Sequence, residues 1–118
     1  MSIDNAIASV AVKDLKSAVT WYEALLGRAP DSTPMPEVAE WKFAHGGWLQ
    51  VYELPARAGG GSFTLAVSNI DEVAANVERL GIDATQRSSG AKVKTLMIVD
   101  PDENHIAFAE ALDTTMAR

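Results

Sequence analysis

The most restrictive feature of the sequence is an internal repeat. A strand-like segment, a helix cap, an apolar helix and a terminating glycine occur twice, about 55 residues apart. The first copy is marked by Val12, Asp14, Leu15 and Gly27, and the second by Val67, Asn69, Ile70 and Gly81. A half of this size can hardly bury its own core, so the halves should pack together or pair with another chain.

The first half predicts a strand, a helix and further strands. Apolar and β-branched residues indicate a strand over Ile7–Val12. Asp14 can cap a helix that Gly27 ends, because glycine adopts the left-handed conformation without steric cost. Three prolines allow at most a short edge strand within 28–36. The remaining strands are expected at 41–44 and 48–52, joined by a turn at His45-Gly46-Gly47.

The second half repeats this order after a glycine-rich loop. The loop at 55–61 ends in three glycines and is expected to be a flexible connector. A strand over Phe63–Val67 should lead into a helix that Asn69 or Asp71 caps and Gly81 ends. The rest is expected to be a strand over Ile82–Gln86, a loop over 87–91, and a closing hairpin of 92–99 and 105–110 around the turn Asp100–Asn104.

Composition narrows the classes of function. The formal net charge of −6 argues against nucleic-acid binding, which needs a basic face. The sequence contains no cysteine, which rules out a disulfide, a thiolate metal site and a thiol nucleophile. No stretch is long and apolar enough to span a bilayer, and the N-terminus lacks the features of a signal peptide. No membrane partner and a cytoplasmic location are therefore expected.

Several short motifs, taken in order, resemble a known superfamily. They are Asp14-Leu15, Ala18, Trp21-Tyr22 and Leu25-Leu26-Gly27, then the second strand–helix unit, then Asp100-Pro101-Asp102-Glu103-Asn104. This order is similar to the glyoxalase, bleomycin-resistance protein and extradiol dioxygenase superfamily, also called the vicinal oxygen chelate fold. The resemblance covers nearly the whole chain. One departure is Glu103, where the family usually has glycine, and this should alter the turn more than the fold.

The resemblance implies an α+β fold of two βαβββ modules. In such proteins an antiparallel-rich sheet curls around a cleft and the helices lie outside. The single domain would comprise module one at about 5–54, a linker at 55–61 and module two at about 62–112. Members are commonly dimers, so a homodimer is expected. Strand alternation agrees, because it turns the apolar residues Val10, Val12, Phe63 and Leu65 toward the helices.

The same resemblance identifies the positions where metal-using members place four ligands. Here those positions hold Ile7, Gln50, Ser62 and Ala107. Ile7 and Ala107 offer no donor atom, whereas a bound cation needs several converging nitrogen or oxygen donors. We therefore predict no metal and no other cofactor. His45 and His105 are expected to be exposed polar residues near turns, and no catalytic residue is assigned.

Aromatic and polar side chains that should line the cleft are the strongest candidates for a binding site. Trp48, Gln50 and Tyr52 alternate onto one face of their strand. Aromatic walls with a few polar groups suit flat or cationic small molecules. The residues predicted to contact a ligand are Trp41, Trp48, Gln50, Tyr52, Ser62 and Thr64. Equally compatible is that the aromatic side chains fill the cleft themselves or lie in a dimer interface.

Three functions follow from these observations. The leading hypothesis is a metal-independent protein that binds and sequesters a cationic or aromatic small molecule, as bleomycin-resistance proteins do. The second is a metal-dependent lyase, isomerase or dioxygenase of the glyoxalase type, supported by the resemblance alone. The third is a partner-binding module whose cleft is filled. Whether the chain is an enzyme therefore stays open, with the missing donors favouring binding.

Overall fold

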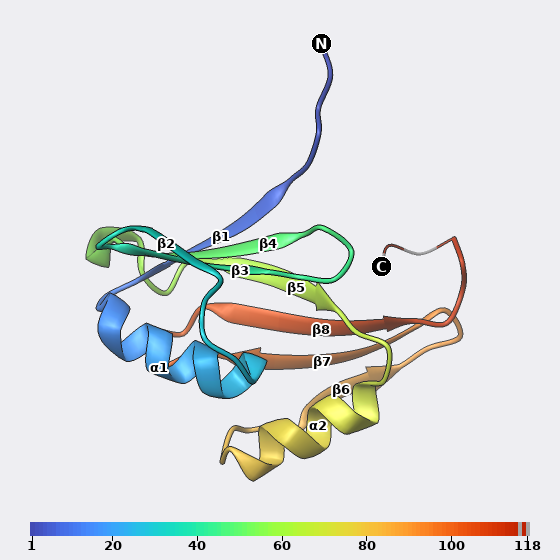
Figure 1. Ribbon diagram of the computed structural model, residues 1–118. Coiled ribbons are helices and arrows are strands. Elements are labelled where there is room, and N and C mark those ends of the chain that lie inside the picture. Colours follow the sequence, from blue (N-terminus) through green and yellow to red (C-terminus); the bar gives the residue numbers. More distant parts are fainter. Residues whose placement is uncertain (116, 118) are drawn as a thin grey trace. The chain divides into compact units, whose positions relative to one another are not determined.

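The strands of the protein form two separate four-stranded sheets, as the computed structural model in Figure 1 shows. The structure describes residues 1–115 and 117. It divides into two compact units: unit 1 comprises Met1–Gly61 with Pro101–Asn104, and unit 2 comprises Ser62–Asp100 with the described residues from His105 onward. Each unit contains one βαβββ series, so the predicted α+β fold of two such modules is confirmed. That the two modules form a single domain stays a prediction.

Along the chain of unit 1, the helix follows the first strand and precedes the other three. Its elements are β1 (Ile7–Val12), α1 (Leu15–Leu26), β2 (Ser32–Met35), β3 (Val38–Lys42) and β4 (Trp48–Glu53). The sheet order is β1-β4-β3-β2, with β1 parallel to β4 and the other pairs antiparallel. Asp14 caps α1 by accepting from the Ser17 backbone N–H at 3.0 Å, and Gly27 ends it at a φ of 80°. Both predicted helix signals are therefore confirmed.

One face of the unit 1 sheet is buried against α1. Helix residues Leu15, Ala18, Tyr22 and Leu25 are buried, and so are the sheet residues Val10, Val12, Ala39, Trp41, Leu49 and Val51. The Tyr22 and Trp41 rings lie 6.2 Å apart between centroids. Burial alternates along β4, so every second residue of this strand faces the helix. The opposite face of the same sheet, which we call the open face of unit 1, carries the other half of the residues.

Unit 2 repeats this arrangement. Its elements are β5 (Ser62–Ala66), α2 (Ile70–Arg79), β6 (Gln86–Ser89), β7 (Val93–Val99) and β8 (His105–Ala111), with sheet order β5-β8-β7-β6. Asn69 caps α2 by accepting from the backbone N–H groups of Asp71 and Glu72. Glu110 on β8 accepts from the Ile70 N–H at 2.8 Å, so a carboxylate also satisfies the first turn of the helix.

One predicted strand is wrong and its neighbour replaces it. Ile82–Gln86 was expected to be a strand, but only Gln86 belongs to one, and β6 runs through Gln86–Ser89, where a loop was predicted. The Ile82 N–H donates back to Val77 and the Thr85 N–H donates to the Asp83 carboxylate. These local bonds bend the chain, and pairing with β7 begins only at Gln86.

The loop before unit 2 is held in place, which corrects the expectation of a flexible connector. It contains a short helical turn, η1 (Pro55–Arg57). The Asn104 side chain is fully buried; its Oδ1 accepts from the backbone N–H groups of Gly59 (3.1 Å) and Gly61 (2.9 Å), and its Nδ2 donates to Ala11 (2.9 Å). Gly59 has a φ of 91°, and a Cβ there would lie 2.6 Å from the Asp102 carbonyl oxygen. The glycines thus permit a close approach rather than flexibility.

We expect Asn104→Ala to lower the free energy of unfolding by about 3 kcal/mol, because the substitution leaves three backbone groups without this partner. Urea unfolding followed by circular dichroism measures the loss. Asn5→Ala in the exposed N-terminal segment is the matched control and should change stability far less. Equal stability of the Asn104→Ala and Asn5→Ala proteins would contradict the role given to Asn104.

Glu103, which stands where the superfamily usually has glycine, adopts a backbone conformation that is unfavourable for a residue with a side chain. Glu103 is the one non-glycine residue among those described with a positive φ, at 73°. A side chain in this region costs roughly 1 kcal/mol relative to glycine, partly offset by the larger entropy of glycine in the unfolded chain. We expect Glu103→Gly to raise the free energy of unfolding by about 0.5–1 kcal/mol. Glu103→Ala removes the same carboxylate but keeps a Cβ, so thermal unfolding should show no comparable gain for it.

Among the described residues, neither helix has the length and apolar character needed to cross a membrane.

Candidate functional site

The open face of unit 1 carries three rows of side chains that run across β1, β4 and β3. Strand pairing places Ser9, Gln50 and Glu40 in the central row. The flanking rows are Ile7, Trp48 and Lys42 on one side, and Ala11, Tyr52 and Val38 on the other. Trp48, Gln50 and Tyr52 therefore share one face, as predicted, and all three are half-buried.

The central row is a continuous hydrogen-bonded chain. The Ser9 hydroxyl donates to Gln50 Oε1 at 3.2 Å, and Gln50 Nε2 donates to Glu40 Oε2 at 3.0 Å. These two bonds fix the orientation of the Gln50 amide. The half-buried Glu40 carboxylate is an acceptor on the face where the aromatic residues lie. The row can therefore bind a hydrogen-bond donor or a cation at Glu40.

Beside this row, Lys42 lies over the ring of Trp48. The Lys42 ammonium nitrogen is 5.9 Å from the ring centroid, a cation–π distance. Trp48 begins β4 and Lys42 ends β3, and the two residues are paired in register. The open face thus offers an aromatic ring, one cation and one carboxylate within neighbouring rows.

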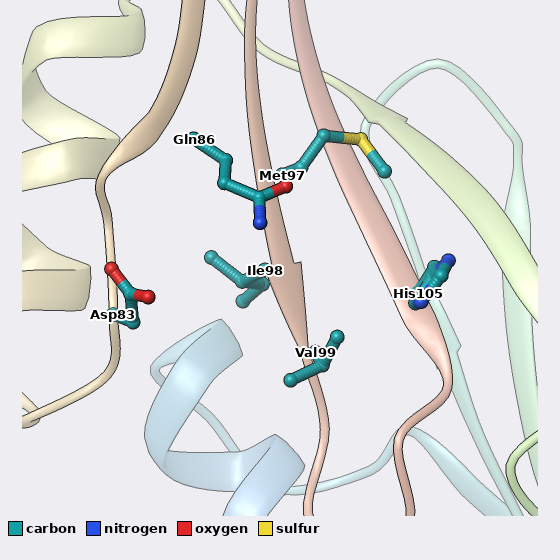
Figure 2. Close-up of a pocket in the computed structure, with 6 residues that line it drawn as sticks. All are labelled: Asp83, Gln86, Met97, Ile98, Val99 and His105. Atoms are coloured by element: carbon teal, nitrogen blue, oxygen red, sulfur yellow. The ribbon is translucent and has the colours of Figure 1, made fainter.

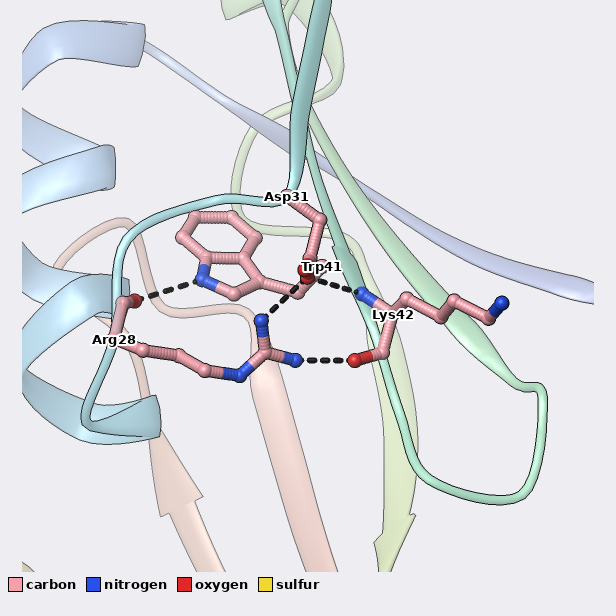
Figure 3. Close-up of polar contacts among 4 residues, drawn as sticks. All are labelled: Arg28, Asp31, Trp41 and Lys42. Carbon is pink, nitrogen blue, oxygen red and sulfur yellow. Dashed lines mark hydrogen bonds and ion pairs between the residues drawn. The ribbon is translucent and has the colours of Figure 1, made fainter.

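A set of polar contacts holds the end of β3 that carries Lys42 (Figure 3). Asp31 Oδ2 accepts from the Lys42 backbone N–H at 2.8 Å and from the Arg28 guanidinium, which also donates to the Lys42 carbonyl. The Trp41 indole N–H donates to the Arg28 carbonyl at 3.0 Å. The Lys42 N–H, and after it the Arg28 guanidinium, hold the pKa of the Asp31 carboxyl below its ordinary value. These contacts tie the segment after α1 to the strand that positions Lys42.

The structure corrects the placement of Trp41. Trp41 is fully buried and is paired with Leu49, so it lies on the helix side of the sheet, opposite Trp48 and Tyr52. Its neighbours on β3, Glu40 and Lys42, face the open side instead. Trp41 therefore belongs to the core of unit 1, because alternation along β3 turns it toward α1.

Ser62 and Thr64 lie on unit 2, at the start of β5. Ser62 is paired with His105 and Thr64 with Ala107, and both hydroxyl-bearing residues are exposed. Phe63 and Leu65, the alternate residues, share the sheet face of the buried Ile106 and Phe108. Whether Ser62 and Thr64 contact a ligand stays a prediction, as it does for Trp48, Gln50 and Tyr52.

Unit 2 also contains an open pocket of about 200 Å³ (Figure 2). Apolar side chains of β7 and polar side chains of its surroundings line it: Asp83, Gln86, Met97, Ile98, Val99 and His105. Asp83 and Gln86 come from the segment that leads into β6, on one side of β7, and His105 begins β8 on the other side.

The residues at the metal positions of the family do not fit a metal ion. Ile7 and Ala107 carry no donor atom, and the Gln50 amide already bonds to Ser9 and Glu40. Within residues 1–115 and 117, no group of three or more histidine, aspartate or glutamate side chains lies close enough to hold a metal. His45 and His105 are exposed, as predicted. The donor set therefore gives no basis for a step routed through a metal.

Comparison with known proteins gives a consistent class. No protein-family model and no curated protein matches the chain. A solved structure described as a glyoxalase/bleomycin resistance protein from Catenulispora acidiphila DSM 44928 is 35% identical, with a TM-score of 0.81; the match covers 91% of this chain and 97% of that one. The fold with its two βαβββ units and this relative define the class. The chain belongs to the glyoxalase/bleomycin resistance protein superfamily.

More distant structures share the fold. The antibiotic binding protein TnmS3 from Streptomyces sp. CB03234 is 19% identical, with a TM-score of 0.78 and coverage of 94% of this chain and 98% of that one. A bleomycin resistance determinant encoded on the transposon Tn5 is 18% identical, with a TM-score of 0.73 and coverage of 94% and 100%. At these identities the comparison shows the fold alone.

Several residues of interest were absent from the sequence-based prediction. Glu40 was missed because β3 begins at Val38, three residues earlier than predicted, and Lys42 was missed because Trp41, its neighbour, was assigned to the ligand side of the strand. Alternation around the apolar Ala39 and Trp41 could have shown that both charged residues face away from the helix. Asp83, Gln86 and Met97 carried no signal, since the pocket depends on the bend that replaced the predicted strand.

The Asp31 contacts predict a pH dependence of stability. Because the folded-state pKa lies below the ordinary value of 3.8, the stabilisation is fully present above that value and is lost as the pH falls through the folded-state pKa. Asp31→Asn should lower stability at neutral pH and show a smaller further loss down to about pH 3 than the parent chain does. Urea unfolding at several pH values measures both effects. Asp4→Asn controls for the loss of one negative charge, and an identical pH profile for the two variants would contradict the assignment.

Proposed function

We propose that this protein binds a small molecule reversibly on the open face of unit 1 and releases it unchanged, without a metal ion. The observation that carries the proposal is the hydrogen-bonded row of Ser9, Gln50 and Glu40 between Trp48 and Tyr52. A rigid polar row flanked by aromatic rings is typical of sites that orient a flat ligand. The sequence has no thiol, and no group of three or more metal-ligating side chains lies together among the described residues, which supports binding rather than covalent chemistry.

The ligand class follows from charge and shape. The Glu40 carboxylate faces the open side and the whole chain has a net charge of −6, so a cationic group is favoured at Glu40. Tyr52 and Trp48 provide aromatic surface for a ring. Membership of the superfamily, together with neighbours described as bleomycin resistance and antibiotic-binding proteins, supports a ligand of the antibiotic kind that is sequestered.

The test is calorimetric titration with bleomycin and with a matched pair of smaller aromatic compounds, one cationic and one neutral. We expect Trp48→Ala to weaken binding about tenfold by loss of the stacking surface. Glu40→Gln should weaken binding of the cationic compound and leave binding of the neutral compound unchanged. Trp21→Phe is the matched control, since Trp21 lies on α1 against Tyr22, at 4.9 Å between ring centroids, and not on the open face.

The outcomes separate the alternatives. Binding by chelator-treated, desalted protein supports the proposal, and a flat response to every compound contradicts it. Turnover of a hemithioacetal or a catechol that stops when metal is removed would replace it with a metal-dependent enzyme. Loss of folding or of self-association in Trp48→Ala, with no ligand bound by the parent chain, would favour a filled, partner-binding face.

The homodimer and the cytoplasmic location stay predictions. Light scattering at several protein concentrations would test the first, and fractionation of cells that express the chain would test the second.

A further inference from the structure

The pocket of unit 2 combines an apolar floor with polar groups at its edge. Met97 and Val99 from β7 are half-buried and exposed, respectively, while Ile98 beside them is buried. Figure 2 shows Gln86 reaching over β7, Asp83 on the segment that precedes β6 with the Ile98 side chain between it and β7, and His105 on the far side. The volume of about 200 Å³ is below the usual range for drug-sized ligands, so the pocket suits a single ring or a short chain.

The polar edge of this pocket is acidic. Its lining includes one carboxylate, one amide and one imidazole, and neither lysine nor arginine lines it. Asp83 Oδ1 accepts from the Thr85 backbone N–H at 2.9 Å, which fixes the side chain in a turn. Hydrogen bonds from Thr85, first from its hydroxyl and then from its N–H, hold the pKa of the Asp83 carboxyl below its ordinary value. The carboxylate is therefore charged at neutral pH, where it attracts cations and repels anions.

We propose that the unit 2 pocket binds a small organic ammonium ion, whose apolar part contacts Met97 and Val99 and whose ammonium group pairs with Asp83. Gln86 and His105 supply further hydrogen-bonding groups at the edge. A bare metal ion is a poorer fit, because only two of the lining residues carry metal-ligating carboxylate or imidazole groups and three side chains are apolar. The pocket uses none of the residues of the unit 1 open face, so this proposal does not rest on the proposed function.

The probes are benzylamine and benzyl alcohol, which share a ring but differ in charge. Binding is followed at one fixed neutral pH by amide chemical shifts of the full chain in two-dimensional NMR spectra. We expect benzylamine to bind weakly, because so small a ligand makes few contacts. Its binding should change the amide chemical shifts of Gln86, of residues 97–99 and of His105. Benzyl alcohol should bind about fivefold more weakly or produce no shifts.

Two variants and a matched control make the test specific. Asp83→Asn keeps an oxygen that can accept from the Thr85 N–H but removes the negative charge. It should weaken benzylamine binding about fivefold. Gln86→Lys adds a cation at the exposed edge and should abolish benzylamine binding. Asp113→Asn is the control, because Asp113 makes the same turn with Thr115 at 2.9 Å and does not line the pocket. The spectra of the variants report directly on their folding.

The proposal is overturned if the benzylamine shifts fall outside the pocket, if the alcohol binds as tightly as the amine, or if Asp83→Asn binds the amine as the parent chain does. Shifts confined to Trp48, Gln50 and Tyr52 would assign the amine to the unit 1 face instead. If the unit 1 face binds none of the compounds in the calorimetric titrations, the benzylamine shifts still test the unit 2 pocket, since these shifts come from different residues.

Discussion

Among its described residues each unit has one α-helix for a four-stranded sheet, and this constraint determines where a binding surface can lie. One helix covers one face, so alternate strand residues must be apolar there and are free to differ on the other face. In unit 1 the covered face holds Trp41, Leu49 and Val51. The other face holds Trp48, Gln50, Tyr52 and the charged residues of β3, together with Ala11 and Val38, which are buried.

Local sequence signals predicted most of the fold, because they act over a few residues. Caps such as Asp14 and Asn69, and the closing hairpin of β7 and β8, are where expected. The wrong strand at Ile82–Gln86 shows the limit of such signals: Ile82 and Ala84 alternate like strand residues, yet local bonds bend the segment. Conversely, the all-polar β6 carries no apolar pattern and is a strand only because its backbone pairs with β7.

The candidate site was only partly predictable, for a related reason. The shared face of Trp48, Gln50 and Tyr52 follows from alternation within one strand, whereas assigning Trp41 required the pairing between two strands. An aromatic residue suits a core and a ligand site equally well, so residue type could not decide between them. The pairing with Leu49 decides it. The Glu40–Gln50 bond is likewise a contact between strands, which a single-strand pattern does not contain.

The geometry of the open face indicates where the cationic group and the aromatic ring of the proposed ligand would bind. Lys42 already lies over the Trp48 ring at 5.9 Å, so a cation arriving on that ring face meets the like charge of an ammonium group. Glu40 is different, because it accepts a hydrogen bond from the neutral Gln50 amide. This bond does not neutralise the negative charge of the Glu40 carboxylate. In the proposed site a cationic group therefore gains more beside Glu40 than over Trp48. For the proposed function, the charge of Glu40 and the aromatic surface of Tyr52 favour a ligand whose cation and ring are adjacent rather than widely separated.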